Sequence, residues 1–113
     1  ELQNWDYTLS LRDGYLEDFT LFPPYPNPWI GKDKIDFDLQ VINPQSIKIE
    51  ICNTLGQIIW RLEKDFPESE VVTITWNGQN SGGRRVANGI YLIQATGRSN
   101  RYLHKVTYLK KSD

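Results

Sequence analysis

Hydrophobic side chains recur at every second position along most of this chain, which is the period of a β-strand with one buried face. The alternation is strict in residues 35–41, which read I-D-F-D-L-Q-V. It returns in later segments, and no stretch shows the three-to-four-residue period of an amphipathic helix. The pattern therefore predicts an all-β protein.

Short segments rich in Asn, Gly, Pro and Ser separate the alternating stretches, and these residues favour turns. The apolar runs on either side of the Asn53–Gly56 turn predict a hairpin over residues 46–63. Residues 63–70, which are polar and contain Pro67, predict a loop. The remaining strands are predicted at residues 35–41, 71–76, 90–96 and 102–110.

Residues 22–29 read F-P-P-Y-P-N-P-W and carry four prolines. Proline fixes φ and lacks a backbone donor, so this segment cannot be a central strand. We expect it to be extended and irregular. Two of its aromatic residues, Tyr25 and Trp29, are better candidates for an exposed position than the aromatics of the predicted strands.

Six or seven short strands at regular spacing predict an immunoglobulin-like antiparallel β-sandwich of about seven strands. We assign residues 19–111 to this domain and residues 112–113 to a tail. Residues 1–18 hold five acids and one base. They are predicted to be a linker or the tail of a preceding domain, with a short edge strand docked on the sandwich as the alternative.

Length and composition narrow the possible functions. The 113 residues suffice for one domain with a single core. The net charge of −1 predicts no nucleic-acid partner, and no apolar run is long enough to span a bilayer. Because the sequence begins with Glu rather than Met, we expect a processed or excised piece of a longer product.

Residues with catalytic chemistry are sparse. Cys52 is the single Cys and His104 the single His, so an internal disulfide and a Cys/His zinc site are ruled out by count. Both lie within predicted strands. A Cys52–His104 pair stays open, but no loop signature supports it, and we expect neither enzymatic activity nor a cofactor.

Two charged segments leave alternatives open. Asp33, Asp36 and Asp38 form the densest acidic cluster. They are predicted to lie on a solvated face paired with Lys32 and Lys34, and a Ca²⁺ site is the alternative. Residues 84–111 carry seven bases and no acid. This predicts a solvated basic face or a contact surface for an acidic partner or polysaccharide.

Four pieces of sequence occur in a fixed order that ends close to the last residue. They are the segment Tyr25, Pro26, Asn27, Pro28, Trp29; the hairpin turn at Gly56; the group Trp76, Asn77, Gly78 followed by Gly89 and Tyr91; and the closing strand Lys105, Val106, Thr107, Tyr108, Leu109, Lys110. Together they resemble the type A C-terminal sorting domains of type IX secretion. The third piece is also similar to the immunoglobulin-like domain of the flagellar hook-capping protein.

This resemblance implies a small, non-catalytic β-sandwich at the end of a larger secreted protein of the Bacteroidetes or related phyla. Such domains are recognised by the outer-membrane translocon, and the cargo is then attached to the cell surface or released. The partners implied are the secretion machinery and the parent cargo domain. The closing strand, Lys105 to Lys110, would carry the recognition, and the other motif residues would be structural.

Three functions are carried forward. The first is a sorting domain, and the second is a passive immunoglobulin-like spacer or interaction module of an extracellular protein. The third and weakest is a carbohydrate-binding module that would use Trp29 or Trp60. For the first, we expect the last strand at a sheet edge, where a receptor pairs with it by strand addition. Val106→Pro is then expected to abolish export without unfolding the domain.

Overall fold

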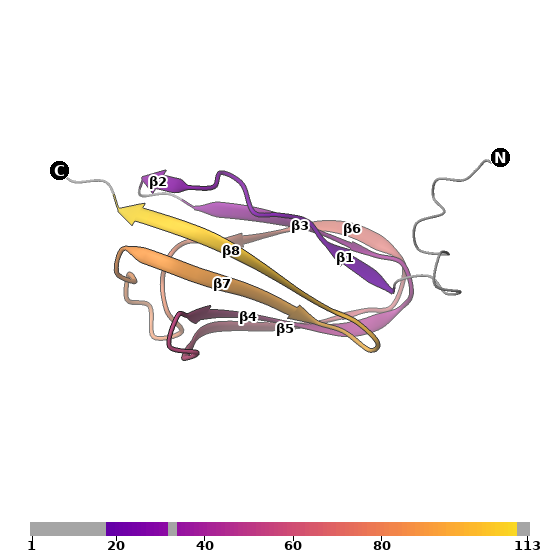
Figure 1. The fold of residues 1–113 in the computed structure, drawn as a ribbon. Helices are drawn as coiled ribbons and strands as arrows, with labels where there is room; N and C mark the ends of the chain where they lie inside the picture. The colour runs from indigo at the N-terminus through magenta and orange to yellow at the C-terminus, as the bar shows by residue number, and fades with distance from the viewer. Residues whose placement is uncertain (1–17, 32–33, 111–113) are drawn as a thin grey trace.

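The structure of this protein, a computed structural model, describes residues 18–31 and 34–110. Two β-sheets pack face to face, and the described residues contain no helix, hence none that could cross a membrane (Figure 1). The strands are β1 (Phe19–Leu21), β2 (Trp29–Gly31), β3 (Ile35–Val41), β4 (Gln45–Asn53), β5 (Ile58–Phe66), β6 (Glu70–Trp76), β7 (Gly89–Thr96) and β8 (Arg101–Lys110).

The three-stranded sheet has the order β1-β3-β6, and the five-stranded sheet has the order β2-β8-β7-β4-β5. Neighbouring strands are antiparallel with one exception, because β2 runs parallel to β8. The predicted β-sandwich is confirmed. The sequence pattern missed β1 and β2, since each has only three residues and is too short to show a period.

The predicted hairpin is confirmed as β4 and β5. The Asn53 side chain fixes its turn, because Oδ1 accepts hydrogen bonds from the backbone amides of Leu55 at 2.9 Å and Gln57 at 3.0 Å. Gly56 adopts a φ of +86°, which glycine tolerates best. The predicted loop at residues 63–70 is wrong in its first half, since β5 runs to Phe66 and pairs with β4 there. Its charged residues lie on an edge strand, where they contact solvent.

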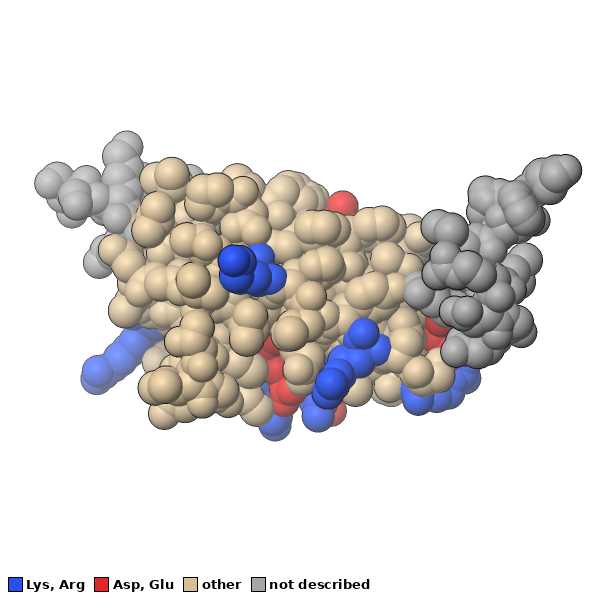
Figure 2. Space-filling view, in the orientation of Figure 1, with Lys and Arg blue, Asp and Glu red and all other residues tan. Residues whose placement is uncertain are grey.

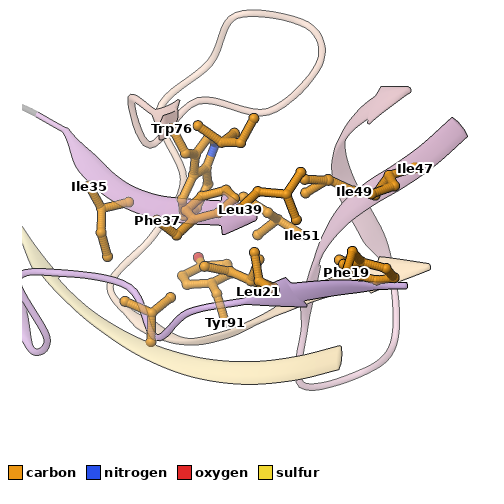
Figure 3. Close-up of a cluster of buried hydrophobic side chains, with 14 of the residues drawn as sticks. Phe19, Leu21, Ile35, Phe37, Leu39, Ile47, Ile49, Ile51, Trp76 and Tyr91 are labelled. Atoms are coloured by element: carbon orange, nitrogen blue, oxygen red, sulfur yellow. The ribbon is translucent and has the colours of Figure 1, made fainter. Parts of the chain in front are cut away.

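The core lies between the two sheets and is filled from both (Figure 3). The apolar positions of β3 all point inward and are buried, as their alternation predicts. Opposite them, Ile47, Ile49 and Ile51 of β4 supply the facing layer. Burying one such side chain contributes roughly 1.5–3 kcal/mol, so this layer makes a large contribution to stability.

Candidate functional site

The closing strand β8 presents two different faces. Tyr102, His104, Val106 and Tyr108 point toward the core as predicted, and the last two are fully buried. The residues between them lie on the outer face of the five-stranded sheet. Of the six predicted recognition residues, Lys105 and Leu109 are exposed on that face, with half-buried Thr107 between them.

The edge of β8 is covered, which contradicts the expectation that this strand lies at a sheet edge. β2 pairs with it in parallel and places Trp29 opposite Tyr108 and Ile30 opposite Leu109. β2 is therefore the edge strand, and β8 is second in the sheet. Sequence reasoning missed this pairing because the proline-rich segment was expected to be irregular, although the prolines exclude only a central strand.

Asn27 continues the cover over the preceding part of β8. Its side-chain Nδ2 donates a hydrogen bond to the carbonyl oxygen of Lys105 at 2.9 Å, and its Oδ1 accepts one from the amide of Thr107 at 3.1 Å. The carboxamide thus pairs as a backbone peptide unit would. It lies between two prolines, which have no backbone N–H to offer. A receptor could add a strand along residues 105–110 only after displacing this segment.

The expectation for Val106→Pro is wrong for a related reason. Val106 is fully buried and lies inside the antiparallel ladder between β7 and β8, opposite Tyr91. Proline there would remove a backbone donor from an interior strand and empty part of the core. This substitution is expected to unfold the domain, so it cannot test recognition.

The opening and closing motifs meet in a buried aromatic cluster, which consists of Trp29, Trp76, Tyr91 and Tyr108. The ring centroids of Trp29 and Tyr108 lie 4.4 Å apart, and those of Trp29 and Trp76 lie 5.7 Å apart. Tyr91 packs edge-on against Trp76 at 5.6 Å. The predicted exposure of Trp29 is wrong, since only 2% of it is accessible. Trp29 therefore cannot stack on a sugar ring, whereas Tyr25 is exposed as predicted.

Gly78 shows why this motif contains a glycine. Its φ is +80°, and a Cβ there would lie 2.9 Å from Cη2 of Trp29 and 2.9 Å from Nη1 of Arg85. Arg85 in turn donates a hydrogen bond from Nη1 to the Tyr108 hydroxyl oxygen at 3.0 Å. The neighbouring Trp76 donates from Nε1 to the carbonyl of Gln79 at 2.8 Å. The turn after β6 thus closes directly over the aromatic cluster.

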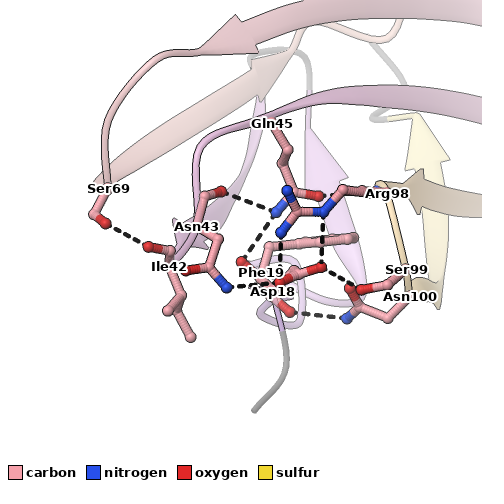
Figure 4. A network of polar contacts seen from close by, with 9 residues as sticks. All are labelled: Asp18, Phe19, Ile42, Asn43, Gln45, Ser69, Arg98, Ser99 and Asn100. Carbon is pink, nitrogen blue, oxygen red and sulfur yellow. Dashed lines mark hydrogen bonds and ion pairs between the residues drawn. The ribbon is translucent and has the colours of Figure 1, made fainter. Parts of the chain in front are cut away.

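A polar network, formed by Asp18, Asn43, Arg98 and Ser99, fastens the start of β1 (Figure 4). The Asp18 carboxylate accepts hydrogen bonds from the Ser99 hydroxyl, from Nδ2 of Asn43 at 2.6 Å and from Arg98 at 3.1 Å. These hydrogen bonds, of which the one from Ser99 has the largest effect, lower the pKa of Asp18 from 3.8 to about 2. Asp18, assigned to the linker from sequence, thus ties β1 to the β3–β4 and β7–β8 turns.

Cys52 and His104 are not brought together. Cys52 lies on the outer face of β4, whereas His104 points inward from β8. His104 donates from Nε2 to the backbone carbonyl of Leu21 at 2.7 Å, which joins the two sheets. Burial raises the pKa of the Cys52 thiol, with a smaller contribution from the charge of Glu50. Neither residue has the surroundings of an activated nucleophile and base.

The aspartates of β3 face solvent and bond to hydroxyls. Thr75 donates to Asp36 at 2.7 Å, while Thr73 and Tyr25 donate to Asp38 at 2.8 and 3.0 Å. Among the described residues no three metal-ligating side chains gather, and Asp33 lies outside the described ranges.

Solved structures that share this fold include the following three. Dimeric latent PorU of Porphyromonas gingivalis superposes with a TM-score of 0.66 and 17% identity, over 84% of this chain and 10% of that chain. PorZ, an essential surface component of the type-IX secretion system of the same organism, superposes with a TM-score of 0.57 and 19% identity, over 90% of this chain and 12% of that chain. FlgD of Xanthomonas campestris, a hook-capping protein of flagellar assembly, superposes with a TM-score of 0.56 and 19% identity, over 80% of this chain and 66% of that chain.

At these identities the likeness shows the fold alone, and the chain spans about a tenth of the length of PorU. No curated protein matches the chain in sequence. A family model does match, and it covers residues 24–108, which include the aromatic cluster and most of β8. The chain therefore belongs to the family of secretion system C-terminal sorting domains, which implies a non-catalytic, secretion-targeting domain exported to the cell surface or beyond.

Proposed function

We propose that this chain directs a larger protein through the outer-membrane translocon of type IX secretion, for attachment to the cell surface or release. The observation that carries the proposal is the family match over residues 24–108. Membership of the family also implies interaction with secretion machinery. The parent protein is the cargo, and this domain is its targeting signal.

Within the domain, we assign recognition to the closing strand, Lys105 to Lys110. Because β2 and Asn27 occupy the backbone edge of this strand, its solvent-facing side chains are the groups that a receptor meets first. The aromatic cluster has a structural role in this recognition. It holds the opening segment against β8 and so keeps those side chains in one fixed arrangement.

The proposal is tested by fusing residues 1–113 to the C-terminus of a reporter enzyme that carries a signal peptide. The matched control is the reporter with residues 1–17 alone. In a host with type IX secretion, the full fusion should reach the surface or medium while the control stays in the periplasm. In a strain without a working translocon, both should stay in the periplasm.

Two results would contradict the proposal. Equal localisation of the fusion and the control in the secreting host would mean that the domain carries no address. Export that persists without the translocon would mean that another route is used. In the first case the domain would be a spacer or interaction module, the second function considered from the sequence.

A further inference from the structure

The outer side of the five-stranded sheet carries a surface that we name the outer β8 face, defined by Ile30, Ile90, Arg101, Leu103, Lys105 and Leu109. The strand register makes it continuous. Ile30 of β2 lies opposite Leu109, and the neighbour of Ile90 on β8 is Thr107, one place from Leu109 along that face. Ile30 is 64% exposed and Leu103 58% exposed, which is high for such large apolar side chains.

This surface differs from the rest of the outside of the sandwich. On the outer face of β3 and β6, threonine hydroxyls bond to aspartates. On the part of the five-stranded sheet formed by β4 and β5, Glu50 is paired with Arg61 at 2.9 Å and with Lys48 at 4.0 Å. Over β2, β7 and β8, by contrast, Figure 2 shows a broad uncharged area with isolated basic patches, and the acidic side chains in view lie at its margins.

The charges on the outer β8 face are all of one sign. The segments of β2, β7 and β8 contain no Asp or Glu. Arg101 and Lys105 form no ion pair with any described residue. Exposed apolar patches rimmed by charge are typical of protein interaction sites, and complementary charge selects the partner.

We propose that the outer β8 face docks on an acidic surface of a secretion-machinery protein that presents apolar side chains between its carboxylates. The proposal rests on the proposed function and names the surface and the chemistry of the partner. Apolar contacts would cover Ile30, Leu103 and Leu109, and carboxylates would pair with Arg101 and Lys105. A second copy of this chain fits less well, because its own Arg101 and Lys105 would face like charges.

Two matched pairs of variants test the surface in the reporter fusion. Lys105→Glu reverses a charge on the outer β8 face, and Lys34→Glu does the same at an exposed position just before β3 of the other sheet. Leu103→Ser removes an apolar side chain from the face, and Val71→Ser removes one that is 66% exposed on β6. All four should fold, as thermal unfolding will verify, because the changed side chains are exposed.

We expect Lys105→Glu and Leu103→Ser each to lower the exported fraction by about tenfold or more, while the control variants export normally. If the unaltered fusion is exported and all four variants match it, the docking surface is refuted while the proposed function stands. If the unaltered fusion is not exported, both fail.

The class of partner is tested by placing a photocrosslinking benzophenone amino acid at Leu103 or, as a control, at Val71. In the secreting host, position 103 should crosslink to a protein of the translocon through an acidic segment, and Lys105→Glu should remove that product. A crosslinked dimer of the chain itself would overturn the proposal. So would binding of the purified domain to vesicles of phosphatidylethanolamine and phosphatidylglycerol that Lys105→Glu abolishes, since the partner would then be a membrane.

Discussion

The aromatic cluster and the Asp18 network lie at opposite ends of the sandwich and fasten the same N-terminal segment by different physics (Figure 1). At one end, Trp29 is buried among uncharged rings. At the other end, a carboxylate is held by hydrogen bonds from Ser99, Asn43 and Arg98. Ring burial does not depend on pH, whereas the network needs an ionised acid. Acid should therefore loosen one end and leave the other in place.

Trp29→Ala should give the largest effect. Removing a fully buried indole leaves a cavity beside Trp76 and Tyr108, and such truncations cost about 3–5 kcal/mol. Urea unfolding followed by circular dichroism will measure the loss. Trp29→Phe, which keeps a smaller ring in place, is the control and should cost less. A cost for Trp29→Ala below that of Trp29→Phe would mean that the cluster does not hold β2.

Gly78→Ala should be the next largest, at about 2–3 kcal/mol, because it combines a positive φ with a close approach to Trp29. Gly83→Ala is a matched control. Gly83 has a φ of +87° but no atom within 4 Å of the added Cβ, so only the backbone penalty of about 1 kcal/mol applies. Equal losses of stability in the two variants would mean that the close approach of Gly78 to Trp29 adds nothing to the backbone penalty.

The Asp18 network should make stability depend on pH in the acidic range. The pKa of Asp18 is lowered in the folded chain, so its contribution is present above about pH 4 and is lost as pH falls toward about 2. Asp18→Asn should lower the free energy of unfolding at neutral pH and reduce its further loss on acidification, as measured by urea unfolding at a series of pH values. Glu68→Gln, at an exposed position, should lose stability in acid as the unaltered chain does. An undiminished loss in Asp18→Asn would mean that other carboxylates cause the acid dependence.

Asn27→Ala should give the smallest effect on global stability, about 1 kcal/mol, because two exposed hydrogen bonds are lost. Hydrogen exchange is the sharper measurement, and the amide of Thr107 should exchange faster. Asn27→Asp keeps the acceptor for that amide and loses only the donor to Lys105, so Thr107 should stay protected. Unchanged exchange of Thr107 in Asn27→Ala would show that β2 alone covers β8.

The sandwich was predictable because its long strands alternate cleanly, as in residues 35–41, where each apolar side chain is buried. The hairpin was predictable from Asn53 and Gly56, whose turn chemistry is local. The end of β5 was not, because its charges resemble those of a loop until their position on an edge strand is known.

The environment of the candidate site was less accessible to sequence reasoning. Trp29 looked exposed because its prolines suggested an irregular segment, and its burial depends on residues 47 and 79 positions away, Trp76 and Tyr108. The position of Asn27 between two prolines is the one feature of the sequence that could have indicated this contact. An amide between two prolines can replace the missing backbone donor, but only the fold shows which strand receives it.

The cover that Asn27 and β2 place over the closing strand also bears on how copies of this domain behave when crowded. An open strand edge invites pairing between chains and aggregation. In the five-stranded sheet, one edge is formed only by the three residues of β2. The other edge, β5, carries four exposed charged side chains within five residues: Arg61, Glu63, Lys64 and Asp65. A secreted protein ending in this domain could accumulate before transport without its sheets joining edge to edge on this side.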